Sequence, residues 1–142
     1  MKALLVNGSP HANGNTARAL VEVAAALTAD GVEAEIVPIG VKPVRGCVAC
    51  GRCRGLGRCV FEDDVANAIL EKAIAADALV LGTPVYYAQP NGVLLAVMQR
   101  VLFASGGRLR GKPAASVAVC RRGGASTAFQ TLNLFYGILG MP

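Results

Sequence analysis

The sequence predicts an α/β protein built on a parallel sheet with helices on both faces. Short apolar runs alternate along the chain with longer segments whose apolar residues recur at helical spacing. The middle runs are apolar at consecutive positions, as expected of strands that are buried on both faces. A chain of 142 residues has the length of one domain and can bury about two thirds of its unfolded surface without disulfides. We therefore predict a single domain over residues 1–142.

The first half of the chain predicts a strand, a loop, a helix and an edge strand. A strand is expected over residues 2–7, followed by the loop GSPHANGNT (8–16), here called the phosphate loop, and a helix over 15–30. Residues 32–39 alternate apolar and acidic side chains, which indicates a half-exposed edge strand. Residues 46–60, here called the cysteine segment, are predicted to form a loop after this strand.

The second half repeats the alternation of helices and strands. Asp63 or Asp64 is the expected N-cap of a helix that ends near Ala76. The remaining elements are expected as strand 78–83, helix 91–105, basic loop 106–113, strand 114–120, turn 121–125 and helix 126–139. Strand 114–120 is apolar enough to need a neighbour on its outer side. We expect that the natural polypeptide continues past Pro142 or that a partner chain covers this edge.

Composition narrows the class of protein. No stretch approaches the 18 or so apolar residues of a membrane span, and the first apolar run is too short for a signal peptide. We expect a cytoplasmic protein without membrane partners, in which clustered cysteines bind metal or perform redox chemistry. The net charge of +5 comes with no basic helix and no basic face with interleaved aromatic residues, so we do not expect a nucleic-acid partner. The charge is better explained as a counter-charge to bound anionic groups.

Four of the five cysteines stand together in the cysteine segment, with two, two and five residues between them: Cys47, Cys50, Cys53 and Cys59. Four cysteines are the usual ligand set of a [4Fe–4S] cluster, and the first two spacings match the bacterial ferredoxin pattern. Zinc, which more often uses two widely separated cysteine pairs, and a redox disulfide are the alternatives. Cys120 stands alone and is expected to be a small buried residue.

The phosphate loop has the composition of an anion-binding site. It follows a strand and opens a helix, whose free N–H groups and dipole attract an anion. Ser9, Asn13, Asn15 and Thr16 add short polar side chains, and His11, the only histidine, is either a phosphate contact or a solvated residue. The loop lacks both the Walker ending and the G-x-G-x-x-G spacing. A plain turn with an asparagine cap is the alternative.

Three segments together resemble a known family. The loop GSPHANGNT, the segment GTPVYYAQPNGVLLAVMQR (82–100) and the turn CRRGGAST (120–127) are similar to the flavodoxin-like NADPH-dependent FMN reductases. The cysteine motif and the following Asp-Asp pair narrow the resemblance to the iron–sulfur flavoproteins. The resemblance implies a flavodoxin-like three-layer sandwich with strand order 2-1-3-4-5, of which the fifth strand is missing from this chain.

The resemblance also implies a set of site residues. The FMN phosphate is assigned to Ser9, His11, Asn13, Asn15 and Thr16; the ring and ribityl chain to Pro84, Val85, Tyr86 and Tyr87; and the ring edge to Arg121, Gly123 and Gly124. The cysteines Cys47, Cys50, Cys53 and Cys59 are assigned to the [4Fe–4S] cluster. Many members carry arginine where this chain has His11, a departure that would make phosphate binding depend on pH. The two tyrosines also suit a flavin from first principles, because each offers a flat apolar ring with a polar tip.

The implied function is an FMN-dependent oxidoreductase that passes electrons between a ferredoxin-like one-electron donor and FMN through the cluster, with no catalytic side chain. Because the cysteine segment follows the second strand, we expect it on the same rim of the sheet as the phosphate loop. The arginines of this segment would raise the cluster potential and dock an acidic partner. The family implies a homodimer or homotetramer with the cluster of one subunit near the flavin of another. The alternatives are a cluster-free reductase of FMN or a quinone that uses NAD(P)H, and a zinc-stabilised binding domain.

Overall fold

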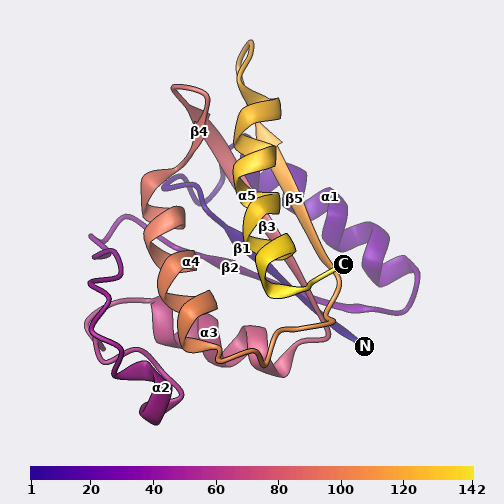
Figure 1. The fold of residues 1–142 in the computed structure, drawn as a ribbon. Coiled ribbons are helices and arrows are strands. Elements are labelled where there is room, and N and C mark those ends of the chain that lie inside the picture. The colour runs from indigo at the N-terminus through magenta and orange to yellow at the C-terminus, as the bar shows by residue number, and fades with distance from the viewer.

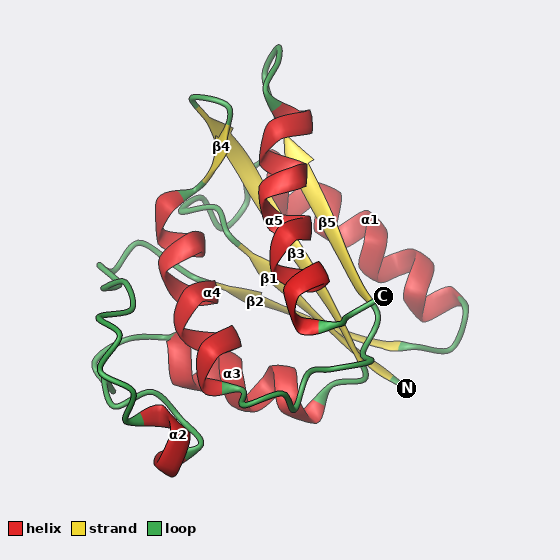
Figure 2. Ribbon diagram, viewed as in Figure 1, coloured by secondary structure: helices red, strands yellow, loops and turns green.

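A computed structural model describes all residues 1–142. Five strands and five helices follow one another along the chain (Figures 1 and 2). In order they are β1 (Lys2–Asn7), α1 (Asn15–Ala29), β2 (Glu33–Pro38), α2 (Cys53–Leu56), α3 (Ala66–Ala75), β3 (Ala78–Tyr86), β4 (Gln89–Pro90), α4 (Gly92–Ala104), β5 (Ala114–Val119) and α5 (Ala125–Leu139). The predicted α/β class is confirmed, and α2, a single turn inside the cysteine segment, is the one helix that the sequence did not predict.

The sheet has the order that the family resemblance implies for its first four strands. The central strand β1 pairs in parallel with β2 on one side and with β3 on the other, and β3 pairs in parallel with β5. The edge strand β2 is half-exposed, as its alternating pattern predicts, whereas β1 and the first part of β3 are buried. Within residues 1–142, β5 pairs with no strand beyond β3.

The end of β3 differs from the expectation. The strand was expected to end at Thr83 but continues to Tyr86, and the chain then turns back through β4, which pairs antiparallel with β3. The turn residues Tyr87 and Ala88 both have positive φ, 50° and 62°. A two-residue hairpin turn of this hand normally uses Asn or Gly, so the sequence carries no recognisable turn signal here.

Helices cover both faces of the sheet and form three layers. On one face, α3, α4 and α5 pack against Leu4, Val6 and Leu81 in the larger core. On the other face, α1 packs alone against the alternate residues of the same strands, with Leu20 against Leu5. Figure 1 shows α4 and α5 in front of the sheet and α1 behind it. Since side chains alternate across a strand, this arrangement follows from the apolar character of β1 on both of its faces.

Charged side chains hydrogen-bond to the backbone at both ends of α3. The N-cap of α3 is Val65 and not Asp63 or Asp64 as predicted, although the Asp64 side chain accepts a hydrogen bond from the N–H of Ala66 (3.0 Å), the first residue of the helix. The Lys112 ammonium donates to the carbonyls of Ala73 (3.1 Å) and Ala76 (2.5 Å) at the end of α3. A cation at a helix C-terminus is stabilised by the helix dipole. The basic loop 106–113 therefore has a structural role.

Helical spacing predicts one buried face on α4 (Leu94, Val97, Met98, Val101 and Leu102) and one on α5 (Phe129, Leu132, Tyr136 and Leu139). The predicted face of α4 is buried. On α5, Leu132 and Tyr136 are buried, whereas Phe129 is 43% exposed. Phe129 lies beside the outer edge of β5, where no further strand is present within residues 1–142. Burial raises the pKa of the Tyr136 hydroxyl, which donates to the Ala115 carbonyl (2.9 Å). None of the helices has the length and apolar character needed to span a membrane.

Candidate functional site

Three loops meet in one cavity at the carboxyl ends of the strands. The cavity has a volume of about 240 Å³ and is lined by Ser9, His11, Gly14, Asn15, Thr16, Pro84, Tyr86, Val119, Cys120 and Arg121. These residues come from the phosphate loop, the end of β3 and the turn after β5. In open parallel sheets, ligands bind at this edge, where the strand order reverses. The sequence placed these loops together, and the structure forms a cavity between them.

The phosphate loop is held by its own hydrogen bonds. The Ser9 N–H donates to Asn7 Oδ1 (3.0 Å), and Ser9 Oγ accepts from the His11 N–H (3.1 Å). Ser9 is 4% exposed and Thr16 is 3% exposed, so both side chains are fixed by packing. Helix α1 begins without a side-chain cap bond. Its first N–H groups therefore have no partner within the helix and are available to an anion.

Two glycines let the phosphate loop lie against β3. The Gly8 N–H donates to the Gly82 carbonyl (2.7 Å). A Cβ atom on Gly8 would lie 2.6 Å from that carbonyl oxygen and 2.6 Å from Leu94 Cδ2. A side chain at this position would therefore push the loop away from the sheet.

The hairpin tip and the turn after β5 contact each other at the mouth of the cavity. Gly124 has φ of 86°, and a Cβ atom there would lie 2.8 Å from Ala88 Cα. Tyr87, on the tip, is fully exposed. The strained Tyr87-Ala88 turn thus lies beside the predicted flavin site, where strained backbone often occurs.

Seven of the twelve residues assigned to the flavin line the cavity: Ser9, His11, Asn15, Thr16, Pro84, Tyr86 and Arg121. The other five lie outside its lining: Asn13, Val85, Tyr87, Gly123 and Gly124. The lining also includes Gly14, Val119 and Cys120, which were not assigned. Cys120 was expected to be buried but is half-buried at this surface. Its position at the carboxyl end of β5 is the signal that could have placed it here.

The four clustered cysteines line a second, much smaller cavity of about 20 Å³, together with Phe61, Arg100, Phe103 and Ala104 among others. All five cysteines of the chain are free thiols. No group of three or more His, Cys, Asp or Glu side chains is arranged to hold a metal ion. Cys47 and Cys50 are exposed, whereas Cys53 and Cys59 are half-buried. The predicted ligands thus share one apolar pocket but do not converge as a complete ligand set.

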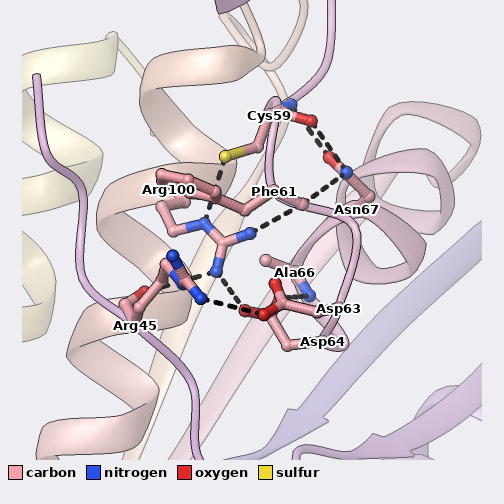
Figure 3. A network of polar contacts seen from close by, with 8 residues as sticks. All are labelled: Arg45, Cys59, Phe61, Asp63, Asp64, Ala66, Asn67 and Arg100. Carbon is pink, nitrogen blue, oxygen red and sulfur yellow. Dashed lines mark hydrogen bonds and ion pairs between the residues drawn. The ribbon is translucent and has the colours of Figure 1, made fainter. Parts of the chain in front are cut away.

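One buried arginine, which the sequence analysis did not single out, organises one side of this pocket (Figure 3). Arg100 is 2% exposed. Its Nε–H donates to Cys59 Sγ (3.2 Å), its Nη2–H to the Phe61 carbonyl (3.0 Å), and Nη1 is paired with Asp64. Burial lowers the pKa of Arg100, but the hydrogen bonds to Asp64 and Cys59 outweigh it and raise the pKa overall. The guanidinium is therefore a permanent positive charge beside the Cys59 sulfur.

Asn67 holds the same cysteine through its backbone. Its Nδ2 donates to the carbonyls of Cys59 (2.9 Å) and Phe61 (3.0 Å), and its Oδ1 accepts from the Cys59 N–H (2.9 Å). The position of Arg100, three residues after the inward-facing Val97 on α4, is the signal that could have identified it. A charged residue in a buried row requires a partner, and Asp64 is that partner.

The expectation that both sites share one rim is wrong. The cysteine pocket is built on the last turns of α4, at Arg100, Phe103 and Ala104. The flavin cavity lies at the carboxyl edge, near the start of that helix. Helix α4 runs antiparallel to β3, and its last turns therefore lie away from the carboxyl edge. The cysteine segment leaves β2 at the carboxyl edge and runs along α4 to these last turns (Figure 1). The two cavities share no lining residue.

The sheet order, the three loops and the carboxyl-edge cavity define a flavodoxin-like α/β protein. A family model described as NADPH-dependent FMN reductase matches residues 1–142. The chain therefore belongs to the NADPH-dependent FMN reductase family, whose members are FMN-dependent oxidoreductases.

Individual relatives agree with this assignment. The chain is 35% identical to an iron–sulfur flavoprotein of Methanocaldococcus jannaschii over 99% of its own length and 74% of the relative. It is 31% identical to an iron–sulfur flavoprotein of Methanosarcina thermophila, covering 99% of this chain and 75% of that one. Among solved structures, RosB with a bound 8-demethyl-8-formylriboflavin-5′-phosphate superposes with a TM-score of 0.79 at 20% identity, over 100% of this chain and 61% of RosB. This last similarity concerns the fold alone.

Proposed function

We propose that this chain binds FMN in the carboxyl-edge cavity and a [4Fe–4S] cluster in the cysteine pocket, and passes electrons between them. The observation that carries the proposal is the meeting of the three loops in one cavity that the N-terminus of α1 helps to line. When bound, FMN supplies two-electron chemistry and the cluster one-electron transfer. A ferredoxin-like protein is the proposed one-electron donor, and NAD(P)H is the alternative donor.

The phosphate loop would bind the FMN phosphate. The N–H groups at the start of α1 and the hydroxyls of Ser9 and Thr16 are donors of the kind that binds a phosphate. His11 and Arg121 line the same cavity and can balance its charge. Tyr86 gives the isoalloxazine ring an aromatic neighbour at the end of β3. The polar side chains that line this cavity suit a phosphorylated ligand better than a purely apolar one.

The cysteine pocket offers donors that suit a cluster. Thiolates are the usual ligands of iron–sulfur centres, and all four cysteines border one pocket that is also lined by Phe61 and Phe103. An apolar lining of this kind limits solvent access and tunes the potential of a cluster. Cys47 and Cys50 are exposed, so they would have to turn inward to complete the ligand set.

The separation of the two pockets supports a proposal about assembly. The residues from Asn91 to Arg100 span on the order of 15 Å along α4, and the two cavities lie toward opposite ends of that helix. We propose a homodimer or homotetramer in which the cysteine pocket of one subunit lies near the flavin cavity of another. Arg52, Arg54 and Arg58 remain exposed and offer a positive surface for an acidic electron-transfer partner.

The absorption spectrum of anaerobically purified protein, combined with assays of iron, sulfide and zinc, tests this function. We expect flavin bands with about four iron and four sulfide per chain. Flavin bands without iron would favour a cluster-free NAD(P)H-dependent reductase. Zinc without flavin would overturn the proposal in favour of a binding domain.

The ligand set is tested with a pair of cysteine variants. Cys53→Ser is expected to lose the iron and keep FMN. Cys120→Ser, which removes a thiol outside the cysteine segment, is expected to keep the iron. If Cys53→Ser retains its full iron content, the assignment of the ligands is wrong.

A further inference from the structure

We propose that Arg100 is the positioning residue of the cysteine pocket: it closes the base of the cysteine segment and donates an N–H to the sulfur of Cys59. The inference rests on the proposed cluster and adds to it a residue outside the cysteine motif. It also holds for the iron-free protein, so it can be tested whether or not a cluster binds.

The guanidinium of Arg100 joins the two ends of the cysteine segment. Nη1–H donates to the Arg45 carbonyl (3.3 Å), immediately before the segment. Nη2–H donates to the Phe61 carbonyl (3.0 Å), immediately after it. Since Arg100 itself belongs to α4, one side chain fixes both ends of the loop to a rigid helix (Figure 3).

Closing the cysteine segment at its base favours metal binding, because the ligands then lose less conformational entropy when the metal binds. Fixing both ends of a loop removes part of the entropy cost of bringing its residues together. Cys59 is the most firmly fixed of the four cysteines, because Asn67 holds its backbone while Arg100 contacts its sulfur. Cys59 is therefore an anchored ligand, and the exposed Cys47 and Cys50 are the ligands that move.

The hydrogen bond to sulfur has an electronic consequence as well. An N–H from a charged group stabilises an anionic thiolate ligand more than a neutral donor does. Hydrogen bonds to the sulfurs are among the factors that set the potential of an iron–sulfur centre. A cluster ligated by Cys59 would therefore be easier to reduce with Arg100 present.

An arginine that served only to neutralise Asp64 would need only one of its edges. Here Nη1 contacts Asp64, while Nε contacts Cys59 and Nη2 contacts Phe61, so the whole planar fork is used. Lysine has a single point of charge and cannot reproduce these contacts. Arg100→Lys should therefore keep the charge beside Asp64 but lose contacts of the planar fork, whereas a neutral replacement loses both the charge and the contacts.

The test uses the double variant Arg100→Met with Asp64→Asn, because removing the arginine alone would leave a buried carboxylate unpaired. Asparagine keeps an oxygen that can accept from the Ala66 N–H. The matched control is Arg18→Met with Glu22→Gln, which removes an exposed arginine and acid pair from α1 (2.6 Å). Arg100→Lys is the third protein, in which the charge beside Asp64 is kept.

Two measurements on protein reconstituted with Fe²⁺ and sulfide address the cluster. We expect the double variant to release iron to a chelator about 10- to 100-fold faster than wild type, the range typical of residues that hold metal ligands. Its midpoint potential, from a redox titration monitored by electron paramagnetic resonance, should be more negative. Arg100→Lys should fall between wild type and the double variant in iron release, and the control should match wild type. Wild-type iron release and potential in the double variant would overturn the proposal.

A third measurement uses iron-free protein and separates this inference from the proposed function. The alkylation of each cysteine by iodoacetamide is followed by peptide mass spectrometry. Each rate is corrected for the thiolate fraction of that cysteine, taken from the pH dependence of its alkylation, because loss of the Arg100 charge also lowers that fraction. The corrected rate for Cys59 should be about tenfold higher in the double variant than in wild type, while those for Cys47 and Cys50 should be unchanged. If wild-type protein binds no iron, the proposed cluster fails, and this comparison still decides whether Arg100 positions Cys59. Equal alkylation of Cys59 in both proteins would overturn the proposal.

Discussion

The phosphate loop and the cysteine segment differ in how far they are formed before any ligand binds. The phosphate loop has buried Ser9 and Thr16, internal hydrogen bonds and close glycine contacts with β3. In the cysteine segment, Cys47 and Cys50 are exposed, and Cys59 is the one cysteine that hydrogen-bonds to side chains from other elements. A preorganised site loses little entropy on binding, whereas a flexible one gains its order from the ligand.

The difference reflects the position of each loop relative to the sheet. Seven residues of the phosphate loop precede α1, and both ends of the loop are fixed by the core. The cysteine segment leaves the edge strand β2 and runs along α4, where it is held at its base by Arg100 and at the Gly57 carbonyl by Arg108. We expect ligands to add little stability to the phosphate loop and much order to the cysteine segment.

The largest expected effect is the loss of stability when the glycine at position 8 is replaced, compared with a glycine of the cysteine segment. Gly8→Ala should destabilise the fold by about 1–3 kcal/mol through overpacking and should also weaken FMN binding, because the added Cβ meets the Gly82 carbonyl and Leu94. Gly55→Ala, where a Cβ meets no atom within 4 Å, should stay within about 0.5 kcal/mol of wild type. Urea denaturation measures both. Equal destabilisation of the two variants would contradict the comparison.

Removal of iron should expose the cysteine segment to protease. Trypsin should cleave after Arg52 and Arg54 about tenfold faster in iron-free protein than in reconstituted protein, because cleavage requires an open chain. Cleavage after Arg110, in the basic loop, serves as the internal reference. Mass spectrometry of the fragments gives both rates, and identical rates after Arg52 with and without iron would show that the segment is already ordered.

Within the phosphate loop, the buried serine should matter more than the exposed asparagine. Ser9→Ala removes the acceptor of the His11 N–H, which should weaken FMN binding by about 1 kcal/mol, close to tenfold in Kd. Asn13→Ala, outside the cavity lining, should change Kd less than twofold. Quenching of FMN fluorescence measures both constants. A larger effect at Asn13 would favour the assignment made from the family resemblance over the geometry.

The smallest effect concerns the strained hairpin tip. Tyr87→Gly should relieve the left-handed conformation at φ of 50° and raise stability by about 0.5–1 kcal/mol, partly offset by the greater freedom of glycine in the unfolded chain. The melting temperature of FMN-free protein measures the gain. Gly123→Ala, in the facing turn with no atom within 4 Å of its Cβ, should change the melting temperature little. A lower melting temperature for Tyr87→Gly would mean that the tyrosine ring contributes contacts that outweigh the strain.

Much of the fold could be predicted from the sequence, because it rests on local patterns. Apolar runs and helical spacing predicted every element except α2 and β4, and the sequence order of strands and helices predicted a parallel sheet. The phosphate loop was recognisable because its function depends on a helix N-terminus that immediately follows it in the chain. The type of chemistry at Cys47, Cys50, Cys53 and Cys59 was likewise suggested by spacing alone.

Tertiary structure decided what depends on contacts between distant residues. It brought Cys120 into the flavin cavity and left Asn13 and Tyr87 outside its lining. It moved the cysteine pocket to the far end of α4, because a loop can follow a strand in sequence and still run away from that strand's end. Arg100 and Cys59 are 41 positions apart, and their contact has no local signature. By itself the sequence determined which residues could bind cofactors, and the packing of α4 against the cysteine segment decided how they are placed.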